Sequence, residues 1–262
     1  MASGSKGNAL WVQAGKTRVL VDLGLGPRQL AARAKHVGAD VRSLAAVLLS
    51  HDHSDHISGV GKLLGNLSVP LFTHHLVAGR AAGPSWGTKE LGHLEGFEVG
   101  GLKITPFALP HDAPGTCGFV FEYEGRKAAH LTDLGHVPAQ LPEWLSEVEL
   151  LSVESNHDLQ MLETGPYPWF LKKRVASDVG HLSNDACGKL LATLARKGRL
   201  KHAVLAHLSE TNNTPQKAFA CAKKYLKGTD VGLSLSCQWD TSSVFTLGEP
   251  QGQMALRGLG RA

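Results

Sequence analysis

The stretch that decides the fold is Ser50-His51-Asp52-His53-Ser54-Asp55-His56-Ile57-Ser58, where three histidines and two aspartates fall within six positions. It follows the apolar run 44–49, which predicts a buried strand because it is bounded by polar residues and too brief for a helix. The segment 57–64 after it favours a helix start despite two glycines. The cluster is therefore predicted to lie on a strand-to-helix turn, where loops held by rigid elements often carry chemistry.

The spacing within this stretch predicts a metal site. His51 and His53 are two residues apart, so in an extended backbone both side chains point the same way and can bind one ion. Asp55 and His56, just past the bend, can turn toward a second ion. Imidazole nitrogen and carboxylate oxygen suit zinc, manganese or iron. A solvated polar loop is the alternative, and the density of ligand types in H-x-H-x-D-H argues against it.

Composition limits the class of protein. The 262 residues are 42% hydrophobic and 19% charged, which is typical of a globular chain. We find no linker, so we predict one domain over 1–262, with the glycine-rich 248–262 as a loose tail. The net charge of +4 is compatible with a polyanionic partner but does not establish one. The sequence shows no signal peptide, no membrane-crossing run and no C-x-x-C pair, so we expect a cytoplasmic protein with reduced cysteines and no membrane partner. It leaves the oligomeric state open.

Polar side chains also follow other apolar runs. His111, Asp133 and His207 each come directly after a predicted strand, and Asp22 ends another, where it can support a metal site or cap the local turn. Predicted helices over 27–37, 74–82, 184–196 and 214–227 follow strand-rich segments. This alternation predicts an α+β fold, a four-layer αββα sandwich with two mixed sheets face to face and helices on the outer faces.

H-x-H-x-D-H after a buried strand resembles the signature of the metallo-β-lactamase fold superfamily. The resemblance implies two divalent ions, Mn²⁺ or Zn²⁺, between which the residues alone do not choose. It implies that a hydroxide shared by the two ions is the nucleophile. It also implies the following ligands: His51, His53 and His111 for one ion, Asp55, His56 and His207 for the other, and Asp133 as the bridge.

The segment Gly180-His181-Leu182-Ser183 resembles the His-x-Ser/Thr element of tRNase Z-like phosphodiesterases. There the histidine stabilises the transition state and protonates the leaving group, so we predict Asp55 and His181 as catalytic residues, Asp55 also as a ligand. His111 and Asp133 are 22 positions apart, too close for the tRNA-gripping arm of tRNase Z itself. The absence of a cysteine at a ligand-bearing strand end argues against a true β-lactamase.

Strings across nearly the whole chain resemble the YycJ/WalJ family of small bacterial proteins. They lie at 2–8, 154–158, 165–169, 177–184 and 206–215. The resemblance implies a metal-dependent 5′-to-3′ DNA exonuclease linked to DNA repair. Three alternatives remain: hydrolysis of RNA or a small cyclic phosphodiester, hydrolysis of a thioester or lactam, which His181 disfavours, and a metal-stabilised binding or regulatory protein without catalysis.

We predict a nucleic-acid partner, with DNA favoured over RNA, and we predict which residues bind it. Aromatic side chains beside the basic run 172–174 offer stacking faces next to phosphate partners, although a docked loop with a solvated basic end is equally compatible. The opening segment 1–8 is either frayed or a phosphate-holding loop. Polar residues near the predicted ligands could hold a terminal 5′-phosphate. The predicted substrate-binding residues are Ser5, Asn8, Asn156, His157, Tyr167, Trp169, Lys172, Ser209 and Asn212.

Overall fold

The computed structural model describes residues 2–65, 69–81, 89–239 and 244–247, so the predicted tail 248–262 lies outside the described residues. The strands are β1 Leu10–Ala14, β2 Thr17–Val21, β3 Ala46–Leu48, β4 Leu71–Thr73, β5 Lys89–Glu90, β6 Phe97–Val99, β7 Leu102–Ala108, β8 Cys117–Tyr123, β9 Arg126–Leu131, β10 Leu150–Glu154, β11 His202–Ala206 and β12 Gly232–Leu235. The helices are α1 Pro27–His36, the 3₁₀ turn η1 Val41–Ser43, α2 Ser54–Ile57, α3 Val60–Leu64, α4 His75–Ala81, α5 Leu141–Trp144, α6 Leu159–Thr164, α7 Trp169–Val175, α8 Asn184–Arg196 and α9 Pro215–Tyr225.

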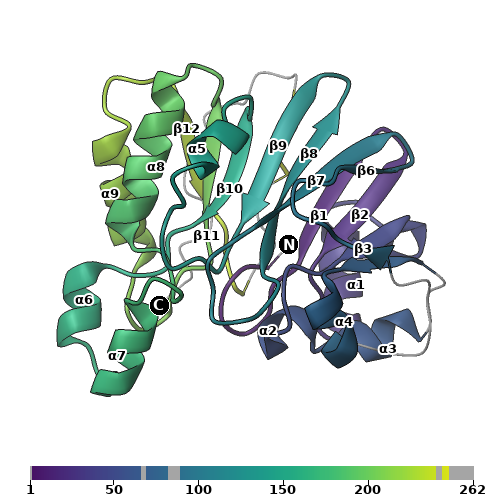
Figure 1. The fold of residues 1–262 in the computed structure, drawn as a ribbon, viewed down its shortest axis with the longest axis horizontal. Coiled ribbons are helices and arrows are strands. Elements are labelled where there is room, and N and C mark those ends of the chain that lie inside the picture. Colours follow the sequence, from purple (N-terminus) through teal and green to yellow (C-terminus); the bar gives the residue numbers. More distant parts are fainter. Residues whose placement is uncertain (1, 66–68, 82–88, 240–243, 248–262) are drawn as a thin grey trace.

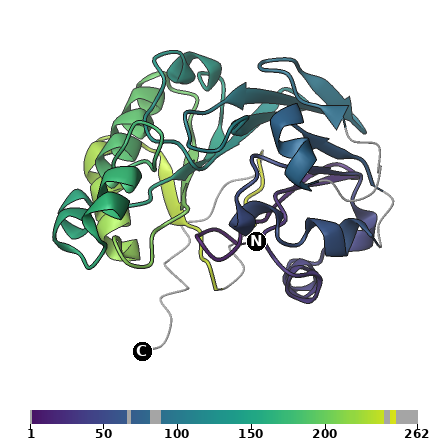
Figure 2. The ribbon, with the colours of Figure 1, turned by 60° about the horizontal axis from the view of Figure 1, so that its bottom comes forward.

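The strands form two mixed sheets. One has five strands in the order β1-β2-β3-β4-β5, and the other has seven in the order β12-β11-β10-β9-β8-β7-β6. In the first, β1 and β2 pair antiparallel and the later strands pair parallel. In the second, β9 to β12 run parallel and β6 to β9 antiparallel. Helices α8 and α9 cover one side and α1, α3 and α4 the other (Figures 1 and 2). The predicted α+β four-layer sandwich is confirmed.

Three apolar clusters fill the spaces between the four layers. Leu131, Leu151 and Leu205 of the seven-stranded sheet pack with Leu190 and Leu191 of α8. A second cluster joins the five-stranded sheet to α1 and α3, and the third lies between the sheets. A strand in a sheet that is covered on both faces needs apolar side chains throughout. β3 is such a strand and is buried along its whole length, as the apolar run 44–49 predicts.

Parallel pairing brings the chemical residues to one edge. Val21 lies opposite Leu48 in the first sheet, and Glu154 lies opposite Ala206 in the second. The carboxyl ends of these strands therefore lie level, and the polar residues that follow them meet where the two sheets approach. A hydrogen bond of 3.0 Å from the Cys117 amide to the Ser50 carbonyl joins the two sheets at this edge.

The polar segment that follows β10 forms two short helices, α6 and α7. Asp158 caps α6 by accepting from the Met161 amide, and Pro168 precedes the first residue of α7. Within the described ranges, no helix has both the length and the apolar character needed to span a bilayer.

Candidate metal centre

The predicted ligands come together at the shared sheet edge. In each of three sets of predicted ligands, and in a fourth set that joins Glu154 and His181 to Asp133 and His207, the potential ligand atoms lie within 4.8 Å of one another. Asp133 groups with His51 from one predicted set and His56 from the other, which is the placement that a bridging ligand requires. Among the described residues, no cysteine takes part. The three sets are His51 with His53 and His111, Asp55 with His56 and His207, and His51 with His56 and Asp133.

Partners outside the cluster orient most of the imidazoles. Such a partner fixes the tautomer and turns the other ring nitrogen toward a metal ion. The contacts to Nδ1 are Ser50 Oγ to His51 at 2.9 Å, Asp22 Oδ2 to His56 at 2.7 Å, the Gly180 carbonyl to His111 at 3.0 Å and Glu154 Oε1 to His207 at 2.7 Å. Nε2 of these four histidines is thereby left to face the common space.

Buried polar atoms in this space fit divalent cations. His51 Nε2, His207 Nε2 and Asp133 Oδ2 are buried, and no hydrogen-bond partner serves them within the described part of the chain. Buried polar atoms are nearly always paired, so such atoms side by side point to a ligand. Nitrogen and oxygen donors without sulfur suit zinc or manganese equally. The cluster is therefore a site for divalent metal ions.

The carboxylates of the centre stay ionised. Burial favours the neutral form of Asp133, but the charges of His207 and His56 outweigh it and hold the pKa of Asp133 well below its usual range. Burial also favours the neutral form of Asp55, but the neighbouring His207 and His56 imidazoles outweigh it and lower the pKa of Asp55. Burial lowers the pKa of His51, which keeps that ring neutral and able to bind a metal. Ionised carboxylates and at least one neutral imidazole thus lie together where cations would bind.

Three residues of the centre adopt left-handed backbone conformations. The φ angles are 62° for Asp22, 62° for Asp133 and 52° for His207, all just beyond strand ends. This region is sparsely populated by residues other than glycine and costs about 1 kcal/mol or more. The sharp turn aims each side chain back toward the sheet edge. Both carboxylate oxygens of Asp22 contact the metal-binding stretch and not the local turn, since Oδ1 accepts from the Ser50 amide and Oδ2 contacts Nδ1 of His56.

Glu154 is the residue that sequence reasoning missed. It belongs to the string 154–158 that resembles the YycJ/WalJ family, and it is fully buried at the end of β10. Its Oε1 contacts Nδ1 of both His181 and His207, and its Oε2 accepts from the Leu134 and Leu182 amides. The available signal was an acid closing an apolar strand, the same signal that marks Asp22 and Asp133.

His181 lies at the edge of the cluster. Its ring centroid is 5.3 Å from that of His111 and 5.4 Å from that of His207, and its side chain keeps 19% exposure. Burial disfavours its charged form, but the charge and hydrogen bond of Glu154 outweigh this and raise the pKa of His181. The structure therefore places a partly exposed, carboxylate-bound imidazole beside the predicted ligands.

The opening segment is an ordered loop over the cluster, so of the two alternatives for 1–8, fraying is wrong for the described residues 2–8. Ala2 and Ala9 form a β-bridge, and Ser3 Oγ accepts from the His207 amide. Asn8 Nδ2 lies 3.1 Å from Asp55 Oδ2 and 2.9 Å from His56 Nε2. Ser5 is exposed on the same loop. Asn8 thus touches two predicted ligands, and its role toward a substrate stays a prediction.

Four other predicted substrate-binding residues lie beside the ligands and are buried. Asn156 Nδ2 donates to the His207 carbonyl, and Ser209 Oγ accepts from the Asn212 amide. His157 Nδ1 and both side-chain polar atoms of Asn212 are buried, with no hydrogen-bond partner among the described residues. Asn156 and Ser209 therefore support the backbone around His207. His157 and Asn212 each keep side-chain polar atoms that a ligand could contact.

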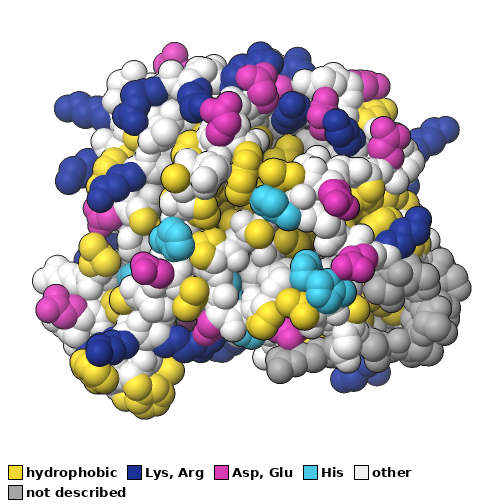
Figure 3. Space-filling view, in the orientation of Figure 1, with side chains coloured by type: hydrophobic (Ala, Val, Ile, Leu, Met, Phe, Trp, Pro, Cys, Tyr) yellow, Lys and Arg dark blue, Asp and Glu magenta, His cyan; other side chains and the backbone are white. Residues whose placement is uncertain are grey.

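The remaining predicted residues lie on or near α7, away from the ligands. Trp169 is 68% exposed and Lys173 Nζ sits 3.9 Å from its ring centroid. Lys172 donates to the Glu163 carbonyl, and Tyr167 is half-buried. Figure 3 shows apolar and basic side chains together over this part of the surface, at lower left. The structure does not bring Tyr167, Trp169 or Lys172 into the cluster.

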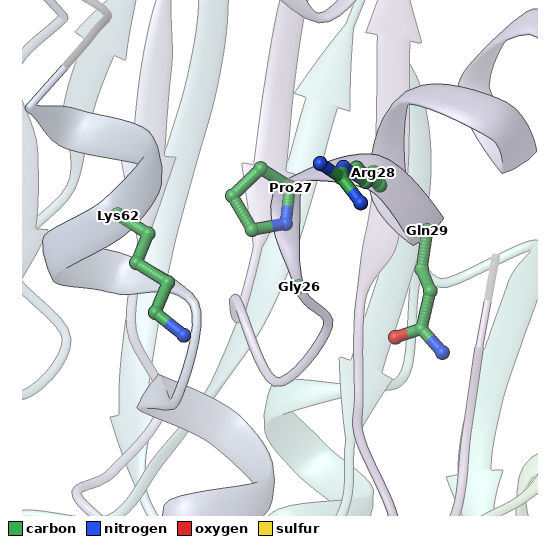
Figure 4. Close-up of a pocket in the computed structure, with 5 residues that line it drawn as sticks. All are labelled: Gly26, Pro27, Arg28, Gln29 and Lys62. Atoms are coloured by element: carbon green, nitrogen blue, oxygen red, sulfur yellow. The ribbon is translucent and has the colours of Figure 1, made fainter.

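A separate hollow of about 470 Å³ lies at the start of α1. Figure 4 shows its walls, which come from Gly26 to Gln29 and from Lys62 of α3. None of the predicted ligands lines it, so it is not part of the metal centre.

Comparisons with known proteins agree with the geometry. A family model described as a beta-lactamase superfamily domain matches residues 17–208. The chain is 33% identical to exodeoxyribonuclease YycJ of Bacillus anthracis over 249 residues, covering 88% of this chain and 90% of the relative. It is 31% identical to exodeoxyribonuclease WalJ of Streptococcus pneumoniae, covering 92% and 93%.

A solved structure shares the fold. The metallo-β-lactamase fold protein YhfI from Bacillus subtilis superposes with a TM-score of 0.66 at 19% identity, over 90% of each chain. Fold, ligand cluster and sequence similarity point the same way: the chain belongs to the β-lactamase superfamily of metal-dependent hydrolases, in the group that contains the YycJ and WalJ proteins.

Proposed function

We propose that this protein is a dinuclear metal-dependent phosphodiesterase, a 5′-to-3′ DNA exonuclease that acts in DNA repair. The observation that carries the proposal is the juxtaposition of two ligand sets, joined at Asp133, with His181 bound to Glu154 beside them. The names of the YycJ and WalJ relatives support DNA as the substrate. Hydrolysis of a thioester or lactam is the alternative that the His181–Glu154 pair disfavours.

Each of the two ligand sets is assigned to one metal ion. His51, His53 and His111 would hold one ion, and Asp55, His56 and His207 would hold the other, since each set can bring its ligand atoms within 4.8 Å of one another. When bound, two such ions would supply a hydroxide nucleophile at neutral pH and neutralise the charge of the attacked phosphate. Buried partners such as Asp22 and Glu154 keep the imidazoles in one orientation, so little reorganisation is needed when a substrate arrives.

His181 delivers the proton that the leaving oxygen requires. Glu154 Oε1 fixes its Nδ1–H, which leaves Nε2 as the donor to the departing 3′ oxygen. Because the same carboxylate also holds His207, donor and ligand keep a constant spacing. Asp55, as a ligand of one ion set, positions the reacting phosphate rather than moving a proton.

The preference for a 5′ end is assigned to the polar residues beside His207. His157 and Asn212 have buried polar atoms without partners among the described residues, which supports a polar contact with a terminal phosphate. Ser5 and Asn8, on the opening loop that lies over the cluster, are assigned to the same contact with the terminal phosphate.

A cleavage assay tests the proposal. Single- and double-stranded DNA and RNA, each with a 5′-phosphate or a 5′-hydroxyl and an end label, are incubated with Mn²⁺, Zn²⁺ or a chelator. We expect nucleotides to be released from the 5′-phosphate end of DNA with metal, and no release with chelator. Faster cleavage of RNA would move the substrate to RNA, and degradation from the 3′ end would refute the polarity.

The non-catalytic alternative is tested with His181→Ala. We expect this variant to retain its metal content while turnover falls at least 100-fold, because the proton donor acts only in the reaction. If the wild-type protein binds metal but cleaves no phosphodiester, the binding or regulatory protein is the better description.

A further inference from the structure

The three consecutive basic residues of α7 make three different contacts. Lys172 Nζ caps the end of α6 at the Glu163 carbonyl, and Lys173 Nζ lies over the Trp169 ring. Arg174 turns the other way, and its Nε donates to Asp112 Oδ2 at 2.5 Å. Of the three side chains, Arg174 is thus the one directed toward the metal centre.

Asp112 links this guanidinium to the ligands. Its Oδ1 lies 3.3 Å from His111 Nε2 and 3.5 Å from His53 Nε2. Its Oδ2 holds Arg174, so a single carboxylate separates the guanidinium from two ligands of one ion set. The hydrogen bond to Asp112 raises the pKa of Arg174, and the charges of Asp133 and Asp55 raise it further.

The backbone beneath Arg174 is fixed to the catalytic groups. A Cβ on Gly180 would lie 2.1 Å from the Arg174 carbonyl oxygen, so the two segments pack without space for any side chain. The Gly180 carbonyl accepts from His111 Nδ1, and the His181 amide donates to the Val175 carbonyl. Arg174 therefore keeps a constant position relative to His111 and His181.

The guanidinium also has unused donors. Only Nε bonds to Asp112, and among the described residues we find no acceptor for Nη1 or Nη2. The side chain is 51% exposed, so these groups face solvent at the rim of the centre. A planar guanidinium with free N–H groups matches the oxygens of a phosphate, and phosphate contacts position a polynucleotide without reading its sequence.

We propose that Arg174 is a substrate-binding residue whose Nη1 and Nη2 contact a backbone phosphate of the polynucleotide while Nε remains on Asp112. The inference rests on the proposed nuclease function and adds a specific phosphate contact on the His53 and His111 side of the centre. It also gives Asp112 a role: the carboxylate holds the guanidinium fork in place, so less side-chain entropy is lost when the phosphate binds.

The test compares Arg174→Gln with Arg199→Gln. Arg199 is matched because it is also an arginine paired with an acid, Glu147, with a similar exposure of 58%, and it belongs to no part of the proposed site. Steady-state kinetics on a 5′-phosphorylated single-stranded oligonucleotide give KM and kcat. Fluorescence anisotropy of the same labelled oligonucleotide in chelator gives Kd without turnover, and metal analysis gives ion content.

For Arg174→Gln we expect KM and Kd to rise about 10-fold or more, kcat to change less than threefold, and ion content to stay unchanged. The slope of log Kd against log salt should fall by about one, as for any single phosphate contact. Arg174→Lys should recover part of the affinity, because it retains the charge but not the fork. Arg199→Gln should remain within twofold of wild type.

Two results would overturn the inference. One is an Arg174→Gln protein that binds and cleaves like Arg199→Gln while the wild type is active, which leaves the proposed function intact. The other is a loss of bound metal or of kcat with Kd unchanged, which would make Arg174 a support for His53 and His111. A wild-type protein that neither binds nor cleaves nucleic acid would instead refute the proposed function, and this inference with it.

Discussion

Glu154 Oε1 accepts a hydrogen bond from His181 Nδ1 at 2.9 Å. The same oxygen lies 2.7 Å from Nδ1 of His207, so one carboxylate orients the proposed proton donor and a proposed metal ligand together. Burial favours the neutral acid, but the charge of His181 outweighs it and lowers the pKa of Glu154 to about 2. Glu154 therefore stays anionic at neutral pH and can hold both imidazoles in one tautomer.

Glu154→Gln should lower kcat strongly and lower the stability of the fold less. The amide cannot accept from two imidazoles and two backbone amides, so His181 loses its fixed orientation. We expect kcat to fall by about 10- to 100-fold, the usual loss when a partner of a ligating histidine is removed. Measurement of kcat, metal content and thermal unfolding separates these effects.

The matched control is Glu149→Gln. Glu149 is also a buried glutamate next to β10, but it pairs with Arg126 at 2.7 Å and Lys201 at 2.6 Å, away from the ligands. We expect this variant to lose some stability and to keep its turnover. A Glu154→Gln protein with kcat within threefold of wild type would show that the shared carboxylate is dispensable.

Asp22→Asn should weaken metal binding rather than catalysis as such. Asp22 Oδ2 lies 2.7 Å from Nδ1 of the fully buried His56, and its charge raises the pKa of His56 against the effect of burial. Without the carboxylate, His56 becomes a poorer and less fixed ligand, so we expect metal affinity to fall about 10- to 100-fold. Competition with a chromogenic chelator measures the loss, and excess metal should restore activity.

Asp40→Asn serves as its control. Asp40 is exposed and pairs with Arg42 two residues away, so its removal should leave metal affinity unchanged. Equal affinities for wild type and Asp22→Asn would mean that the His56 ring is held by packing alone.

The metal centre was largely predictable because its signals are local. H-x-H-x-D-H places four ligands within six residues, and Asp22 and Asp133 share the pattern of an acid after a strand and before Leu-Gly. Glu154 also closes an apolar strand but is not followed by Leu-Gly, and its role depends on groups 27 and 53 residues away. The three basic residues of α7 look equivalent in sequence, whereas the helix turns only Arg174 toward the ligands. Such contacts arise from tertiary packing, which local spacing does not encode.

Gly180→Ala should disrupt the centre through backbone contact. The added Cβ would lie 2.1 Å from the Arg174 carbonyl oxygen and 2.4 Å from that of Val175. The turn that positions His111 and His181 must then shift, so we expect a stability loss of about 1–3 kcal/mol and a larger loss of activity. Thermal unfolding and nuclease assays on the same preparation measure both.

Gly61→Ala is the corresponding control. Gly61 lies within α3, and a Cβ there would meet no atom within 4 Å. Because alanine is favoured over glycine in a helix by about 0.5–1 kcal/mol, this variant should be neutral or slightly stabilised. If Gly180→Ala behaved in the same way, the turn would be more adaptable than its packing indicates.

His130 should make folding stability depend on pH. It is buried on β9 with Nδ1 2.9 Å from Ser152 Oγ, and burial lowers its pKa to about 4. The unfolded chain binds this proton near pH 6.5, so between pH 6.5 and 4 the unfolded state holds more protons and acid destabilises the fold. Protonation of His130 leaves the free energy of unfolding unchanged above pH 6.5 and should lower it by about 2 kcal/mol at pH 5. Urea unfolding in chelator at pH 7.5 and 5 measures this loss of stability. His130→Gln is the control, because its other histidines titrate as they do in the wild type. Parallel losses in the two proteins would show that His130 does not contribute.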